Sequence, residues 1–207
     1  MLEQRIFAMN DVAEAREVVA AFGWATMITA PPDRGLVVSH LPVVVDPAAA
    51  EDRLVILGHL ARTDAALHEL GRHDTVLVVQ GPHGYVSPTF YTGGPYVPTW
   101  NFVVVHLHGR PEPLDGDETY AVLDRTVDHF ERYQDKPWRL DSVAAYANRI
   151  AGGVTGFRLT PDRVVGKAKL SQEKPAEDVR GVVAALDDAN PLLATAMHRV
   201  TRVSRKE

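Results

Sequence analysis

Two segments that read as β-strands carry polar side chains where apolar ones are expected. The segments are 36–46 and 53–61, and the residues in or just after them are Ser39, His40, Gly58, His59, Arg62 and Thr63. Buried polar groups need partners. A phosphate dianion partners arginine, hydroxyl groups and free N–H groups at a strand end or helix start. The pattern therefore favours a site for a phosphate-bearing ligand, at which Gly58 lets a flat ring approach closely. In the alternative, structural interpretation, Arg62 pairs with a surface carboxylate and His59 is a core histidine.

A second candidate is the segment 80–101, which joins prolines and glycines to aromatic side chains. Hairpin loops usually have about 2 to 5 residues, so this segment is long for a simple connection. As a free loop it would leave apolar surface in water. We expect it to pack against a ligand or another subunit, and the alternative is a long loop that only covers one end of a barrel.

Histidines and lysines add weaker signals. The histidines in or beside predicted strands are His40, His59, His83, His106 and His108. Two of them, His106 and His108, share a strand face as a metal pair would. No acidic ligand lies at a matching spacing, so no metal site is predicted. Segment 166–172 places two lysines on one face before a serine and a glutamine, which would suit an anion or a flavin carbonyl, although alternating lysines are usually solvated.

The composition argues against several classes of chemistry. The absence of cysteine removes disulfides, thiolate nucleophiles and cysteine-bound metals. No dinucleotide glycine motif, P-loop, nucleophile elbow or zinc-protease motif occurs, so those classes lose support. Nucleic-acid binding depends on lysine and arginine, and a formal net charge of −5 gives it no support. One basic concentration, interpreted as a solvated helix face, lies at His198, Arg199, Arg202, Arg205 and Lys206.

Local signals predict a mainly β chain with helices at several points. The predicted helices are 12–22, 118–133, 142–151, 176–188 and 192–203. The predicted N-caps are Asp11, Asp64 for a helix after 53–61, and Asp115 or Asp117. Gly23 is expected to end the first helix in the left-handed conformation.

The predicted strands suggest an antiparallel barrel. They are 24–30, 36–46, 53–61, 75–80, 101–107, 155–159 and 164–170, the last two as a hairpin around 160–163. Pro42 has no N–H to donate, which marks its strand as an edge or a bulge. Strands at short spacing with brief helices between them predict an α+β, mainly β fold rather than alternating βαβ units.

The 207 residues, 45% of them hydrophobic, are enough for one globular domain. We expect a barrel domain over 1–172 and a helical appendage over 173–207 packed on it. The sequence shows neither a signal-peptide pattern nor an apolar run long enough to cross a bilayer, so we expect a cytoplasmic protein.

Five strings occur in an order and spacing that resemble one known family. They are Ser39-His40-Leu41-Pro42, Gly58-His59-Leu60-Ala61-Arg62, Gln80-Gly81-Pro82-His83 with Tyr85-Val86-Ser87-Pro88, Val97-Pro98-Thr99-Trp100-Asn101, and Gly166-Lys167-Ala168-Lys169-Leu170-Ser171-Gln172. Over nearly its whole length the chain resembles the PaiB-type FMN-binding negative transcriptional regulators. It departs from the family pattern before Phe7, at Phe90, where tryptophan is usual, at Gly93-Gly94 and at Glu173.

The resemblance implies an FMN-binding split β-barrel, related to pyridoxamine-phosphate oxidases and flavin reductases, that works as a homodimer with FMN between protomers. It also implies a set of FMN contacts. These are Arg62 and Ser39 at the phosphate with His59 and Thr63 in support, Gln80, Trp100 and Asn101 at the ring or ribityl chain, Lys169, Ser171 and Gln172 at the ring edge, and His40 and Leu41 as further cofactor contacts.

Three functions remain open from the sequence. The first, implied by the resemblance, is a regulator that represses target genes and binds FMN. The second is an FMN-dependent oxidoreductase, in which the flavin supplies the redox chemistry and His83, Tyr85, Trp100 and Lys169 shape the substrate side. The third is a flavin or haem binder without chemistry, with a histidine as axial ligand.

Overall fold

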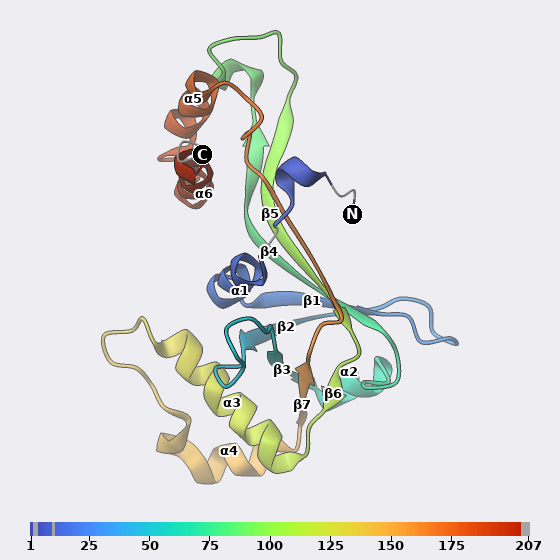
Figure 1. Cartoon of the computed structure of the whole chain (residues 1–207). Coiled ribbons are helices and arrows are strands. Elements are labelled where there is room, and N and C mark those ends of the chain that lie inside the picture. The colour runs from blue at the N-terminus through green and yellow to red at the C-terminus, as the bar shows by residue number, and fades with distance from the viewer. Residues whose placement is uncertain (2–3, 10, 204–207) are drawn as a thin grey trace. The chain divides into compact units, whose positions relative to one another are not determined.

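The computed structural model of the chain describes residues 1, 4–9 and 11–203. For residues 201–203 it describes the backbone only. The chain divides into two compact units, and Figure 1 labels most of their helices and strands. Unit 1 contains the described residues of 1–10, 80–105 and 165–207, and unit 2 contains those of 11–79 and 106–164.

The elements confirm the predicted α+β, mainly antiparallel fold. The helices are α1 (Val12–Ala21), α2 (Arg62–Leu67), α3 (Gly116–Glu131), α4 (Ala144–Ala151), α5 (Ala176–Leu186) and α6 (Pro191–Val203), with 3-10 turns η1 (Arg5–Phe7), η2 (Pro88–Phe90) and η3 (Leu140–Val143). The strands are β1 (Trp24–Thr29), β2 (Val37–Val45), β3 (Ile56–Ala61), β4 (Thr75–Val86), β5 (Thr99–Gly109), β6 (Glu112–Pro113), β7 (Val154–Leu159) and β8 (Arg163–Lys169).

Unit 2 is built on an antiparallel sheet with the strand order β6-β7-β3-β2-β1-β4. Helix α3 contacts β2, β3 and β7, and α4 lies beside α3 (Figure 1). The contact between α3 and the sheet is a buried cluster of Val44, Leu57, Leu114 and Val122. This cluster holds α3 on one face of β2 and β3, next to the strand end from which α2 begins.

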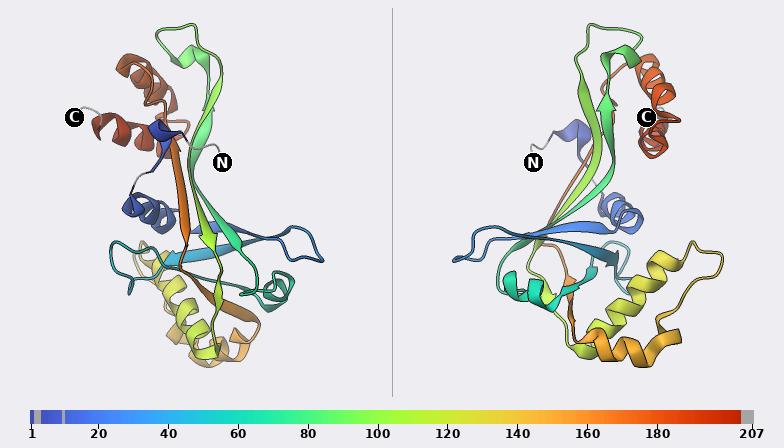
Figure 2. Two further views of the ribbon diagram at one scale, coloured as in Figure 1. Left: turned by 45° about the vertical axis from the view of Figure 1, so that its right-hand side comes forward. Right: turned by 180° about the vertical axis from the view of Figure 1, so that it is seen from behind.

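Unit 1 contains the other parts of β4, β5 and β8, in that order, together with α5 and α6. Figure 2 shows α5 and α6 side by side in both of its views. Their buried apolar residues are Val179, Val182, Val183, Leu186, Leu193, Ala194 and Met197. Asn190, between the helices, donates from Nδ2 to the carbonyl of His83 in β4 at 2.9 Å. The predicted division into a barrel over 1–172 and an appendage over 173–207 stays a prediction.

Two of the predicted helix caps are confirmed. Asp11 Oδ1 accepts the N–H of Ala13 at 2.9 Å at the start of α1. Asp115 forms a capping box with Glu118 at the start of α3. The predicted cap at Asp64 is wrong, because α2 begins at Arg62 and leaves Asp64 inside its first turn.

The left-handed ending predicted at Gly23 is also wrong. Gly23 is not among the glycines with positive φ, and α1 closes instead with the N–H of Phe22 bonded to the carbonyl of Val18. A Cβ on Gly23 would lie 2.4 Å from the carbonyl oxygen of Val43. The position requires glycine because β2 passes close by, and not because of its φ angle.

Pro42 does not mark an edge strand, since β2 lies between β1 and β3. The N–H of the next residue, Val43, donates to Gly23 on the β1 side at 2.7 Å. Successive residues of a strand direct their N–H groups to opposite sides, so the nitrogen of Pro42 faces the β3 side. The pairing of β2 with β3 ends at Val43, so the missing N–H falls just beyond that ladder.

The hairpin predicted around 160–163 is wrong as well. Strand β7 pairs with β3 and β6, whereas the sheet neighbour of β8 is β5. The long loop predicted over 80–101 is shorter than expected, because β4 continues to Val86 and β5 begins at Thr99. The residues between the two strands, 87–98, include η2.

Candidate functional site

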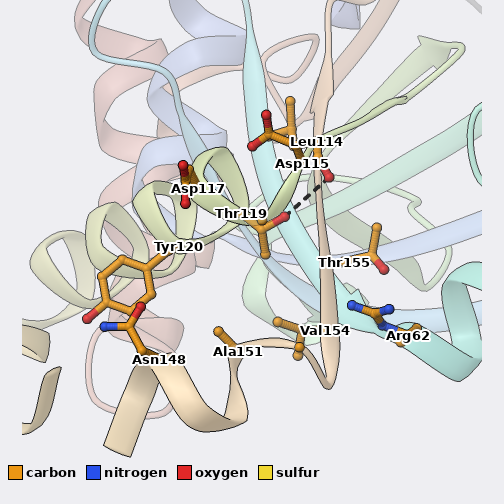
Figure 3. A pocket seen from close by; sticks show the side chains of 12 residues that line it. Arg62, Leu114, Asp115, Asp117, Thr119, Tyr120, Asn148, Ala151, Val154 and Thr155 are labelled. Atoms are coloured by element: carbon orange, nitrogen blue, oxygen red, sulfur yellow. Dashed lines mark hydrogen bonds between the residues drawn. The ribbon is translucent and has the colours of Figure 1, made fainter. Parts of the chain in front are cut away.

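Arg62 stands at the point where β3 passes directly into α2, in unit 2. Its backbone N–H donates to the carbonyl of Gly153 at 2.9 Å, which fixes the start of the helix. Its side chain lines a cavity of about 280 Å³, whose wall also includes Asp115 and Asp117. Figure 3 shows Arg62 and Thr155 on one side of this cavity and Tyr120 and Asn148 on the other. The guanidinium forms no ion pair or hydrogen bond with any residue that the structure describes, which leaves its donors available for anionic oxygens.

His59 lies in β3 opposite Gly156 of β7. Its Nδ1 is buried and has no hydrogen-bond partner among the described residues. Burial lowers the pKa of the His59 ring, which favours the neutral imidazole. A buried polar atom without a partner costs about 1–3 kcal/mol, so an orphan of this kind indicates a place where a ligand or a water supplies the partner.

Ser39, in contrast, has two partners inside unit 2. Its hydroxyl donates to Asp64 Oδ2 at 3.0 Å, and His68 Nε2 lies 3.0 Å from the Ser39 hydroxyl oxygen. The other nitrogen of that ring, Nδ1, lies 3.0 Å from Thr29 Oγ1. Ser39 is therefore close to α2, as the sequence predicts, but its hydroxyl is engaged by protein atoms.

Three other residues of unit 2 that were predicted as FMN contacts differ in accessibility. His40 is exposed, and its Nδ1 lies 3.0 Å from Thr26 Oγ1 on the neighbouring strand. Leu41 is 1% exposed and belongs to the core. Thr63 is exposed in the first turn of α2, next to Arg62. The structure thus brings Ser39 and the start of α2 together in unit 2 and leaves only part of the set accessible.

Unit 1 contains a hollow of about 260 Å³ with aromatic walls, lined by Gln80, His83, Trp100, Phe102, Val103 and Val104. The ring of Trp100 is 50% exposed and stacks on His83, with 6.2 Å between centroids and 24° between planes. Tyr85 meets the same indole edge-on at 6.3 Å. An accessible indole beside a hollow is suited to stacking against a planar ring.

Asn101 and Ser171 are buried at 0% and 1% exposure, respectively. The amide Nδ2 of Asn101 donates to Ser171 Oγ at 2.9 Å and lies 3.5 Å from the sulfur of Met197 in α6. Ser171 holds a positive φ of 63°. These two side chains join the end of β8 to β5 and α6 within unit 1.

Lys169 and Gln172 are also partnered in unit 1. The ammonium of Lys169 donates to Thr99 Oγ1 and, at 3.0 Å, to the carbonyl of Trp100. Burial lowers the pKa of Lys169, and nearby Glu173 opposes that change. Gln172 Nε2 donates to the carbonyl of Ala168 at 2.7 Å, and its Oε1 accepts the N–H of Leu170.

The roles of two acidic residues could not be predicted from the sequence. Asp178 in α5 is 2% exposed and binds the segment 91–98: it accepts from the N–H and hydroxyl of Thr92, the N–H of Gly93 and the hydroxyl of Tyr96, at 2.8–2.9 Å. Those donors, Gly93 first, lower the pKa of Asp178 to about 2. Asp64, with His68, forms the contacts to Ser39. In each case the partner lies far along the chain, so no local signal could have found it.

The paired histidines of β5 lie beside a cation. His106 and His108 have ring centroids 6.3 Å apart, and Arg163 Nη2 lies 3.1 Å from the His108 ring nitrogens. Among the described residues no group of three or more potential ligands could hold a metal ion. Of the basic C-terminal residues, His198 and Arg199 lie in α6, whereas the side chain of Arg202 and all of Arg205 and Lys206 lie outside the described part of the chain.

The antiparallel sheet and the helices packed on it have the architecture of a split barrel. A family model described as "Putative FMN-binding domain" matches residues 1–163. The chain belongs to this family.

Two relatives are similar to the chain over most of its length. The chain is 27% identical over 190 residues to "Protease synthase and sporulation protein PAI 2" of Bacillus subtilis, covering 90% of each chain. It is 29% identical over 187 residues to the uncharacterised protein AN0679 of Emericella nidulans, covering 72% of this chain and 74% of the relative.

Among solved structures, the fold resembles an FAD- and haem-binding protein from Mycobacterium smegmatis, with a TM-score of 0.62 and 14% identity over 86% of this chain and 79% of the other. It also resembles the flavocytochrome Anf3 of Azotobacter vinelandii, with a TM-score of 0.58 and 16% identity over 80% and 72%. At this identity the likeness concerns the fold. None of the described helices combines the length and apolar character that crossing a bilayer requires. The predicted cytoplasmic location stays a prediction.

Proposed function

We propose that this chain is an FMN-binding transcriptional regulator and that Arg62 binds the phosphate of FMN. The observation that carries the proposal is the guanidinium at the β3–α2 junction, which lines a cavity and has no partner among the described residues. The orphaned Nδ1 of His59 in the same unit fits a phosphate or ribityl oxygen, and the exposed hydroxyl of Thr63 adds a donor beside Arg62. Family membership supports FMN as the ligand.

For unit 1 we propose contacts between the aromatic hollow and a flavin ring. Trp100 and Gln80 line the hollow and are exposed, so both can meet a ligand without losing a protein partner. Asn101, Lys169, Ser171 and Gln172 were predicted as contacts too. Their present hydrogen bonds favour a role in holding the end of β8 beside β5, with only spare acceptor or donor positions left for a ligand.

The direct test compares FMN with riboflavin, which lacks the phosphate. We expect fluorescence titration to give tighter binding for FMN by at least about tenfold, the scale of one charge-assisted contact. Equal affinities for the two flavins would overturn the phosphate assignment. Failure of both to bind would overturn flavin binding altogether.

We propose that the working form is a homodimer that uses the exposed face of β1 and β2. Directly opposed residues of an antiparallel pair point to the same side, and Trp24 faces Pro42 while Ile28 faces Val38. Trp24 is 63% exposed and Val38 is 52% exposed, so an apolar sheet face lies open in unit 2. Such a face is typical of a surface covered by another protein.

The dimer proposal predicts that Val38→Asp shifts the mass measured by light scattering from dimer to monomer. Val97→Asp is the matched control, since Val97 is also exposed but lies in unit 1. A monomeric wild-type protein, or a Val38→Asp variant that stays dimeric, would contradict the use of this face.

The regulatory role is proposed from the resemblance to the PaiB-type regulators and is tested on DNA. An electrophoretic shift with promoter fragments at about 50 mM salt detects electrostatic binding at its strongest. If no fragment shifts, direct DNA binding is dropped and FMN binding is unaffected.

A second candidate function, an FMN-dependent oxidoreductase, is favoured by the open hollow beside His83, Tyr85 and Trp100. FMN would supply the redox chemistry, and these side chains would orient a planar substrate. Turnover of a reduced nicotinamide cofactor by flavin-loaded protein is the test, and an inert protein would exclude this candidate for such donors.

A further inference from the structure

A chain of hydrogen-bonded side chains runs through unit 2 beneath α2. Its members, in order, are Asp64, Ser39, His68, Thr29 and Thr75, and each is 3.0 Å from the next. His68, Thr29 and Thr75 are 1%, 2% and 3% exposed, respectively. These hydrogen bonds link the short helix α2 to three strands of the sheet, β2, β1 and β4. We call it the His68 relay.

The chemistry of its members fixes the direction of the first bonds. The carboxylate of Asp64 only accepts, so the single proton of the Ser39 hydroxyl is given to it. The Ser39 oxygen must then accept, and His68 donates to it from Nε2. Burial lowers the pKa of His68, although Asp64 nearby opposes this. The neutral ring therefore carries its proton on Nε2, and Nδ1 accepts from Thr29.

Helix α2 needs this support because it is too short to be stable alone. It has six residues and no side-chain N-cap, whereas isolated helices below about 12 residues are marginal in water. The relay holds it near both ends, through Asp64 in the first turn and His68 at the C-cap. Arg62 and Thr63 stand on that first turn, so the relay determines where their donors point.

We infer that the His68 relay positions Arg62 and Thr63 for the phosphate, and that Ser39 contributes through Asp64 instead of touching the ligand. The inference rests on the proposed function. The hydroxyl proton of Ser39 is already given to Asp64, so Ser39 has none to offer a phosphate oxygen. Ser39 and His68 are positioning residues, and Arg62 is the group that contacts the anion.

A double-mutant cycle separates positioning from direct contact. A direct ligand at Ser39 predicts that Ser39→Ala still weakens FMN binding when Arg62 is already alanine. Positioning predicts that Ser39→Ala weakens FMN binding by about tenfold, the scale of one hydrogen bond to a charged group, and adds little once Arg62 is alanine. Riboflavin affinity should be unchanged in every variant. Additive losses would overturn the inference.

Rescue and exchange measurements keep the test decisive if Ser39→Ala folds poorly. Ser39→Thr retains the hydroxyl and should bind FMN like the wild type, and Thr29→Val should reproduce the loss while Thr29→Ser does not. Hydrogen exchange by mass spectrometry should rise in peptides covering 62–68 in Ser39→Ala and Thr29→Val. Ser142→Ala, at an exposed serine of unit 2, is the matched control.

The outcomes distinguish failure of the proposed phosphate site from failure of the positioning role. If Arg62→Ala leaves the preference for FMN over riboflavin intact, the proposed phosphate site fails. If Arg62→Ala abolishes that preference while Ser39→Ala and Thr29→Val preserve it, the phosphate site stands and the positioning role of the relay is wrong.

Discussion

Polar residues predicted as contacts to one ligand occur in both units, and the two units use them differently. In unit 2, Arg62 and His59 present donors or acceptors that no described residue occupies. In unit 1, Asn101 and Ser171 are bonded to each other, and Lys169 is bonded to Thr99. The comparison teaches that residue type and spacing identify candidate ligands, whereas the hydrogen-bond inventory separates groups that bind from groups that build the fold.

The difference between binding and structural residues should have its largest effect at Arg62. Arg62→Ala should weaken FMN binding by about 2 kcal/mol or more, the scale of a lost charge-assisted contact, while the free energy of unfolding changes by less than about 0.5 kcal/mol. Fluorescence titration and urea denaturation measure the two quantities. Arg62→Lys serves as the control, since it keeps the charge and loses the bidentate fork. An unaltered FMN affinity would place Arg62 among the structural residues.

Asn101 should show the reverse behaviour. Asn101→Ala removes a 0%-exposed amide and leaves Ser171 without this partner, so the free energy of unfolding should fall by about 1–3 kcal/mol. Thermal and urea denaturation give the loss. The folded fraction should still bind FMN with the affinity of the wild type, and a large drop in that affinity would return Asn101 to the binding set.

A substitution at His59 tests the same difference between binding and structural residues, with a smaller expected change in stability. His59→Leu removes an orphaned polar atom, so the free energy of unfolding should stay level or rise by about 1 kcal/mol or less, while FMN affinity falls. A clear loss of stability would show that His59 has a partner in solution and is a core residue. Denaturation and flavin titration on the same preparation decide between the two.

Asp178 provides the pH-dependent test, confined to unit 1. Its pKa falls from an ordinary 3.8 to about 2 in the folded chain. A lowered folded pKa means that the contribution is complete above the unfolded value and is lost as the pH falls from about 4 through 2. In that window hydrogen exchange of 91–98 should increase in the wild type. Asp178→Asn should already show increased exchange at pH 7 and little further change on acidification.

The sequence predicted those parts of the fold that local interactions decide. Asp11 and Asp115 cap helices through atoms two or three residues away, and both were found. The hairpin of β7 and β8 was wrong because a turn signal says where a chain reverses and nothing about which strands then pair. Pro42 was misread for the same reason, since the position of its strand within the sheet is set by non-local pairing.

The candidate site, like the fold, could be predicted only where the signal is local. Arg62 and His59 were predicted because their own types and places carry the signal. The partners of Ser39 lie 25 and 29 residues further along the chain, and Thr92 is 86 residues from Asp178. No sequence pattern within one segment records such distant contacts. The sequence around a serine therefore cannot distinguish a serine that binds a ligand from one that supports a helix.

The contacts beneath α2 also set a limit on protein engineering. A designer who wished to transplant the anion-binding turn of this chain into another barrel could not move residues 62–68 as an independent cassette. The recipient would need a serine and two threonines at the matching places on three of its own strands, because His68 bonds to Ser39 and Thr29, and Thr29 in turn bonds to Thr75. Without them the transplanted imidazole would be left in an apolar interior, and the graft would unwind.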